Sequence, residues 1–173
     1  MPGMPGTSQY DGFGVYGVAG ASSLLTVTPV VTASTPYSAG YCVGGFLTFG
    51  NIFRSIGRGI LVNAFLGIGA IENASFSLYL LSAPLSGASS VSDNAAPTIA
   101  IADASKFIGL PIALATYVNE SAISLYEVTA IQKIVRSTDG TQNLYGYVTT
   151  ASALTNNFTT TNALTVGLGV LLD

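Results

Sequence analysis

The chain has no histidine and a single cysteine, and charged residues make up only 8% of its 173 positions. Without histidine, neither a Ser-His-Asp triad nor a Cys-His pair can form, and the imidazole ligands of cupin-type metal centres are missing too. One cysteine, Cys42, excludes an intramolecular disulfide and cannot hold zinc alone. Because its neighbours are apolar, we expect a buried thiol. Enzymatic chemistry would have to rest on carboxylates.

Clustered positive charge is also scarce. Lysine and arginine total five and the formal net charge is -3; the only close pairs are Arg54 with Arg58 and Lys133 with Arg136. Neutralising phosphates requires clustered cations, so we predict no nucleic-acid partner. No apolar run reaches the roughly 18 to 20 residues that a membrane-spanning helix needs, so no membrane partner is expected.

Hydrophobic residues, in contrast, make up 49% of the chain. With so little charge, the surface must consist of Ser, Thr, Asn and Gly, or be covered by other protein copies. Both the low charge and the apolar content favour self-association. We therefore predict a homo-oligomer, a dimer or a trimer, and a subunit of a larger assembly.

The first 22 residues differ in composition from the rest. They are rich in Gly, Pro and Tyr and carry one charge, Asp11. This composition predicts an extended N-terminal arm over 1–22, followed by one folded domain over 23–173. The aromatic residues Tyr10, Phe13 and Tyr16 of the arm are candidates for contacts with another subunit.

From residue 24 onward, apolar and polar residues alternate in short runs that are separated by turn residues. The predicted strands are 24–32, 41–50, 57–69, 74–82, 121–135, 143–150 and 163–172. Helical signal is confined to a short turn within 92–110 and to 149–157. Many short strands with regular turns predict an all-β fold, a β-sandwich of jelly-roll kind, with a barrel as the alternative.

Several local signals refine this prediction. Gly44–Gly45 indicates a bulge within a strand, and Asp139–Gly140 is a strong signal for a hairpin turn. In 74–82, Phe76, Leu78 and Leu80 fall on one face. In 163–172, one face is formed by Leu164, Val166, Leu168 and Val170.

The carboxylates offer little chemistry. Glu120 and Glu127 are seven residues apart, so a regular strand would point them to opposite faces. A calcium loop needs alternating oxygen ligands, whereas Asp93 and Asn94 are adjacent and Asp103 follows nine residues later. We expect Asp93 and Asn94 to form an Asx-turn and Asp103 to be the N-cap of a helical turn. No metal and no cofactor is predicted.

Five segments, in order, resemble a known group of proteins: "YSAGYCVGGFLTFGNIFRSIGRGILVNAFLG", "FSLYLLSAPL", "SDNAAPTIAIADASKFIG", "NLYGYVTTASALT" and "LTVGLGVLLD". They are similar to head decoration, or cement, proteins of tailed bacteriophages, over roughly 37–173. The matching positions are Gly44, Gly45, Arg54, Gly57, Gly59, Asp93, Asn94, Ala95, Ala96 and Asp103.

The resemblance implies a jelly-roll-like fold, no catalysis, and binding across subunits of the major capsid protein on the outer surface of a virion assembled in the bacterial cytoplasm. Arg54 and Arg58 lie in a glycine-flanked connection, where guanidinium groups could pair with carboxylates of a shell. We expect a non-enzymatic structural role. The alternatives are a receptor- or glycan-binding fibre domain, a jelly-roll coat protein and a carboxylate-only hydrolase.

Overall fold

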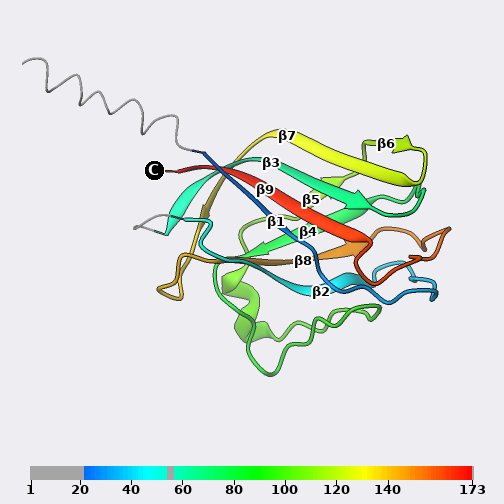
Figure 1. The fold of residues 1–173 in the computed structure, drawn as a ribbon. Helices are drawn as coiled ribbons and strands as arrows, with labels where there is room; N and C mark the ends of the chain where they lie inside the picture. Colours follow the sequence, from blue (N-terminus) through cyan, green and yellow to red (C-terminus); the bar gives the residue numbers. More distant parts are fainter. Residues whose placement is uncertain (1–21, 54–56, 173) are drawn as a thin grey trace, which may run out of the picture.

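The structure is a computed structural model that describes residues 22–53 and 57–172. These residues form two packed antiparallel sheets (Figure 1). The five-stranded sheet has the order β1 (Ser22–Val27), β9 (Leu164–Leu172), β3 (Arg58–Ile68), β7 (Ile123–Arg136), β6 (Tyr117–Glu120). The four-stranded sheet has the order β2 (Cys42–Phe49), β8 (Leu144–Thr150), β4 (Phe76–Leu81), β5 (Ile112–Leu114). A single 3-10 helix among the described residues, η1, covers Ile101–Lys106.

The strand pairing is that of a jelly roll. β1 pairs with β9, β2 with β8, β3 with β7, and β4 with β5, so strands from the two halves of the chain are nested as antiparallel pairs. Such nesting distinguishes a jelly roll from a meander. β6 adds a hairpin strand to the edge of β7. The predicted all-β sandwich of jelly-roll kind is confirmed.

The core forms between the sheets from the faces that the alternation predicted. The buried residues of β4 and β9 include Phe76, Leu78, Leu80, Leu164, Val166, Leu168 and Val170. Removing such side chains from water contributes about 25 cal/mol per Å² of apolar surface. Period-two burial therefore fixes which face of each strand meets the other sheet.

The predicted glycine bulge is also present. The pairing of β2 with β8 shifts between Val43 and Phe46, and Gly44 and Gly45 have φ angles of 81° and 67°. A Cβ atom on Gly44 would lie 2.5 Å from Pro29 Cγ. Glycine is required here both by the left-handed backbone and by the close approach of the 28–41 connection.

A long excursion, residues 82–111, covers the face of the four-stranded sheet that points away from the five-stranded sheet (Figure 1). It is held to two strands of that sheet: Asn94 N–H donates to Cys42 O of β2, and Ile108 N–H donates to Leu80 O of β4. A second apolar cluster lies beneath it. Its members are Cys42, Phe46, Tyr79, Leu81, Leu85, Val91, Ile99, Phe107, Tyr145 and Tyr147. This sheet is consequently buried on both faces, and every residue of β8 is buried.

Three predictions of local structure need correction. Asp139–Gly140 is not a hairpin turn, because β7 pairs with β3 and β6 while β8 pairs with β2 and β4; the turn instead carries the chain from one sheet to the other. Residues 149–157 are not helical, since β8 continues to Thr150 and turns follow. Ser22, assigned to the arm, is the first residue of β1 and pairs with Leu171. The rest of the predicted arm lies outside the described residues.

Candidate functional site: an uncovered sheet face

The predicted turn at Asp93 and Asn94 is present, but the Asp93 carboxylate has unexpected partners. It accepts hydrogen bonds from Thr32 N–H and Oγ1–H, both at 2.6 Å, from Tyr37 O–H at 2.7 Å, and from the Gly44 N–H at 2.5 Å. These partners are 49 to 61 residues away in sequence, in place of the neighbouring amides that an Asx-turn would use. Asp93 therefore ties the excursion to the bulge of β2 and to the 28–41 connection.

This carboxylate also affects its neighbours. Burial and the hydrogen bond to Asp93 raise the pKa of Tyr37 well above its ordinary value. Burial, with the nearby negative charge of Asp93, raises the pKa of the Cys42 thiol to about 12. The expected buried thiol is confirmed. A thiol with so high a pKa is a poor nucleophile, because the thiolate is the reactive form.

Asn94 adopts a left-handed conformation with φ 52°, which asparagine tolerates better than most residues. Its N–H donates to Cys42 O at 2.9 Å, and Cys42 N–H donates to Ala95 O at 2.9 Å. This pair of backbone bonds fastens the excursion to the edge of β2. The Asx-turn predicted for Asn94 is not formed, because its side-chain oxygen is buried without a hydrogen-bond partner and only its main-chain N–H holds the excursion.

Asp103 is not the N-cap of a helical turn. The N-cap of η1 is Ala100, which makes no side-chain capping bond, and Asp103 lies inside the helix with its side chain buried. The carboxylate accepts from Ser86 N–H at 3.0 Å and from the hydroxyls of Ser86 and Ser89 at 2.8 and 2.5 Å. Lys106 Nζ lies 2.8 Å away. Hydrogen bonds from Lys106, Ser89 and Ser86 lower the pKa of Asp103 far below the usual range.

Asp139 organises the turn between the sheets. Its Oδ1 accepts from Ser137 Oγ–H at 2.5 Å and from Thr141 N–H at 3.0 Å, and its Oδ2 accepts from Tyr145 O–H at 2.7 Å. Burial opposes ionisation, but these hydrogen bonds outweigh it and lower the pKa of Asp139. Gly140 follows with φ 79°, which favours glycine. Both residues lie in the connection between the two sheets, in place of the hairpin that was predicted.

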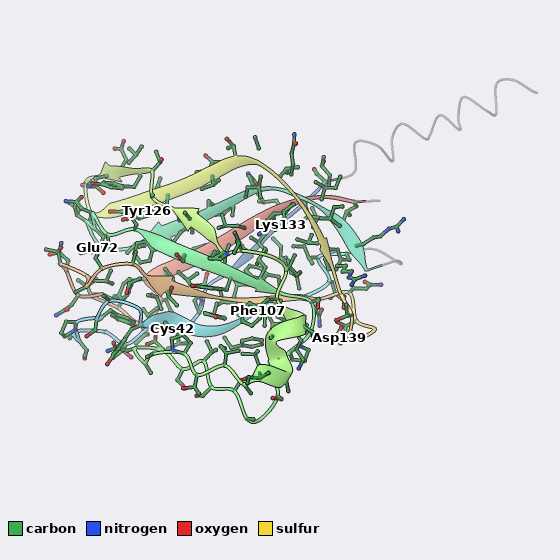
Figure 2. All side chains as sticks on the ribbon, turned by 180° about the vertical axis from the view of Figure 1, so that it is seen from behind. Cys42, Glu72, Phe107, Tyr126, Lys133 and Asp139 are labelled. Carbon is green, nitrogen blue, oxygen red and sulfur yellow. The ribbon has the colours of Figure 1, made fainter. Side chains whose placement is uncertain are left out.

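Glu72 is a structural carboxylate that the sequence did not reveal. It is buried, and its side chain accepts from the N–H groups of Thr155 and Asn156 at 3.1 and 2.6 Å. Its main-chain oxygen accepts from Tyr126 O–H at 2.8 Å, and the two residues lie together at one end of the sandwich (Figure 2). No local pattern announces such a role, since the partners of the carboxylate are more than 80 residues away.

Within residues 22–53 and 57–172, no group of three or more His, Cys, Asp or Glu side chains is placed to hold a metal ion. In the same part of the chain, no helix is long and apolar enough to cross a membrane. Glu120 and Glu127 are on neighbouring strands, β6 and β7, and both are exposed. The carboxylates with the densest hydrogen bonding, Asp93, Asp103 and Asp139, are occupied by the protein's own donors.

Exposed apolar side chains instead gather on the face of the five-stranded sheet that points away from the core, called the outer face below. They are Leu24, Ile60, Val118, Ile123, Leu125, Ile134 and Leu171. Leu171 is directly opposite Ile60, and Ile60 is directly opposite Ile134, so these three form one row across β9, β3 and β7. Contiguous apolar surface of this kind is typical of interaction sites.

Two cations border this row. Arg58 is opposite Arg136 in the register of β3 and β7, two residues from Ile60 and Ile134 on the same face, and both arginines are exposed. Arg54, Tyr10, Phe13 and Tyr16, the other predicted interface residues, lie outside the described residues. Arg136 was not among the predicted interface residues, because its sequence neighbour Lys133 suggested a different pair.

Lys133 has another role. A bulge in β7 at 130–132, where Ala130 and Gln132 have φ angles of 57° and 51°, rotates the strand. Lys133 Nζ then donates to Ile108 O at 3.2 Å and to Leu110 O at 2.5 Å, and burial lowers its pKa. It thus fastens β7 to the segment that leads into β5 and is separated from Arg136.

At the far end of the outer face lies an apolar groove of about 380 Å³. Gly67 and Gly69 of the β3 end form its floor, and Phe65, Ile123, Leu125 and Thr165 are among the residues of its walls. We call it the glycine groove. The outer face therefore has two apolar parts, the row beside Arg58 and Arg136 at one end and the glycine groove at the other.

No protein-family model and no curated protein matches this sequence. Among solved structures, the chain has a weak likeness to one described as "Structure of infectious bursal disease virus Gx strain", with 10% identity and a TM-score of 0.22. The likeness covers 88% of this chain and 38% of that one.

Proposed function

We propose that the protein is a non-enzymatic structural subunit of a virion, a decoration subunit that binds across major capsid protein subunits on the outside of a phage head. The observation that carries the proposal is the difference between the two sheets. The four-stranded sheet is covered by the 82–111 excursion, whereas the outer face of the five-stranded sheet presents the row Leu171, Ile60 and Ile134 to solvent.

An exposed row of this kind suits a protein surface as its partner. The row is apolar and nearly free of charge, so burying it against a shell desolvates few ions. Aliphatic side chains at the centre and arginines at the border match the composition of protein interfaces, in which the core is apolar and the rim polar. Arg58 and Arg136 would form bidentate pairs with carboxylates on the shell, and these pairs would set orientation and on-rate.

The resemblance of residues 37–173 to head decoration proteins supports the same proposal. Two of the matching positions, Gly44 and Asp93, are joined by a hydrogen bond in the structure, and a third, Asp103, joins Ser86, Ser89 and Lys106 within the excursion. Those shared positions therefore maintain the covered face, which leaves the outer face as the surface for contact with the capsid.

Two isoleucines on opposite sides of the molecule allow a direct test. Ile134 is on the outer face and is 72% exposed, while Ile101 is on η1 in the excursion and is 94% exposed. Capsids of the phage that encodes the chain, lacking this subunit, would be incubated with tagged Ile134→Asp or Ile101→Asp protein and sedimented. We expect Ile134→Asp to lose binding and Ile101→Asp to bind like the parent.

Mass spectrometry of purified particles supplies the second measurement. We expect the chain to be present in many copies and to be released from intact particles by high salt, since part of its attachment is electrostatic. Absence of the chain from purified particles, or equal binding by the two aspartate variants, would overturn the proposal.

A further inference from the structure

The glycine groove is separate from the row beside Arg58 and Arg136. Thr165 in its wall is six residues along β9 from Leu171, which corresponds to about 20 Å at the rise of a strand. Its floor and walls carry no charged side chain: Phe65, Gly67, Gly69, Ile123, Leu125 and Thr165. Such a concave apolar site suits an apolar or aromatic side chain.

Gly67 is not required by the fold. A Cβ atom placed on it would lie 3.6 Å from Leu125 Cδ2 and 4.0 Å from Thr165 Cβ, which are ordinary contact distances, and its backbone is not left-handed. Gly167 differs, because the Phe65 ring occupies the place of its Cβ. A glycine within a strand costs about 0.5–1 kcal/mol relative to alanine. The protein therefore carries a glycine that the strand does not need in the floor of the groove, where a side chain would fill it.

The chain contains a segment that matches the groove. Residues 10–18 read Tyr-Asp-Gly-Phe-Gly-Val-Tyr-Gly-Val, with a single charge at Asp11. Phe13 has a glycine on each side, so its ring could enter a narrow groove while the flanking backbone approaches the walls closely. Burial of one aromatic ring in this way gives a large apolar gain with few rotamers to restrict.

The groove is assigned to a second copy because the low charge and the exposed apolar face of the chain favour self-association. Ser22 is opposite Leu171, and β1 runs from there toward the end of the sheet where Val27 is opposite Val166. Ser22, the first described residue, therefore lies at the end of the sheet that is far from the groove of its own subunit. Phe13 is nine positions before Ser22, and nine residues extend at most about 30 Å. This reach is close to the length of β3, so it can span to a neighbouring domain.

We propose that Phe13, in the N-terminal segment 10–18 of one copy, inserts into the glycine groove of a second copy and thereby links subunits through exchanged arms. This inference concerns self-association and does not depend on the proposed binding to a capsid. Its failure and the failure of the proposed function are separable, since one is read from the mass of the free protein and the other from particle binding.

The test uses the full-length chain and variants on both sides of the contact. Phe13→Ala removes the inserted ring, Gly67→Leu fills the groove, and Leu125→Ser removes a wall should Gly67→Leu fail to fold. Gly87→Leu is the matched control, because a Cβ atom at Gly87 meets nothing within 4 Å. Sedimentation velocity over a concentration series gives the self-association constant. We expect each groove or arm variant to weaken association by about tenfold or more, equal to about 1.4 kcal/mol, and Gly87→Leu to behave like the parent.

Mixing separates exchange from folding back. Phe13→Ala retains an intact groove and Gly67→Leu retains an intact Phe13, so an equimolar mixture should associate more strongly than either variant alone. A photo-crosslinking residue at position 13, in a mixture of isotopically light and heavy chains, should give light–heavy crosslinks to peptides of the groove. A monomeric parent, association unchanged in Phe13→Ala, or crosslinks confined to single chains would each overturn the proposal.

Discussion

Arg58 and Arg136 lie directly opposite each other on β3 and β7. Like charges in directly opposed positions of a sheet destabilise it by roughly 0.2–1 kcal/mol. Repulsion between the two arginines therefore opposes the pairing of β3 with β7. Carboxylates of a partner at this position would reduce that repulsion.

Replacing Arg136 with threonine should therefore stabilise the free protein. We expect the free energy of unfolding in urea to rise by about 0.2–1 kcal/mol at low ionic strength, with a smaller gain in high salt because repulsion between exposed charges is screened. Arg136→Lys is the control, since it retains the charge. A lower stability of Arg136→Thr at both ionic strengths would contradict this account of the pair.

The Tyr37–Asp93 contact provides a second prediction. Tyr37→Phe keeps the buried ring, which packs edge-on against Phe158, but removes the hydroxyl that donates to Asp93 and accepts from Thr32 N–H. Loss of a buried hydrogen-bond partner should lower the free energy of unfolding by about 1–3 kcal/mol. Tyr117→Phe on the exposed strand β6 should be nearly neutral. Equal effects of the two substitutions in urea titrations would be inconsistent with a special role for the Tyr37 hydroxyl.

Gly167 and Gly87 provide a third prediction, because substitution by alanine meets crowded surroundings at Gly167 and open space at Gly87. A methyl group on Gly167 would collide with the Phe65 ring, while one on Gly87 would meet nothing within 4 Å. We expect Gly167→Ala to destabilise the protein by about 1–3 kcal/mol, the usual cost of overpacking, and Gly87→Ala to change it little. Thermal unfolding of both variants decides the point, and recovery of stability in Gly167→Ala with Phe65→Ala would identify the colliding ring.

The strands could be predicted from the sequence because each is specified by its own residues. The alternation in 163–172 identified the buried face of β9, and Gly44–Gly45 identified the bulge, since positive φ angles leave a signature in residue type. The Asp139–Gly140 signal was read as a hairpin although its two strands enter different sheets. A tight turn can have the same sequence whether it joins two paired strands or two strands of different sheets. Only the pairing of those strands with distant parts of the chain distinguishes the two.

The site could be predicted much less well. Asp93 and Glu72 hold segments that are distant in sequence, and Asp103 joins residues within the excursion. Residue spacing therefore gave their structural role at best and their partners not at all. Arg136 was overlooked because its position opposite Arg58 depends on the register of β3 with β7. Lys133, three residues away on β7, lies on the other face of the strand. The apolar row on the outer face depends on the register of three strands. No property of one strand reveals it.

The rate at which the Cys42 thiol is labelled reports whether the 82–111 excursion covers the four-stranded sheet. Since burial and Asp93 raise the pKa of its thiol to about 12, the native protein should react very slowly with thiol reagents at neutral pH, and the reaction should follow opening of the 82–111 excursion. Asn94→Ala, which replaces the residue next to Asp93 in the excursion, should speed the labelling. Fast labelling of the native parent would show that the excursion does not cover Cys42 in solution.

The last prediction concerns acid and the excursion. The pKa of Asp103 is lowered in the folded protein by Lys106 and the two serines, so this carboxylate stabilises the fold above the pKa of an unfolded aspartate, about 3.9. As the pH falls from about 4, that contribution is lost progressively. The excursion should then lose its internal order before the sandwich unfolds. Hydrogen exchange at the amides of Ser86 and Phe107 should accelerate in this range, while amides of β9 stay protected.

In the Asp103→Asn variant, the same two amides should exchange fast already at neutral pH and show a much smaller acceleration in acid. Asp139→Asn is the matched control, since it removes another carboxylate of lowered pKa outside the excursion. It should leave the acid step at Ser86 and Phe107 unchanged, and loss of that step in Asp139→Asn would assign the acid response to the turn between the sheets instead.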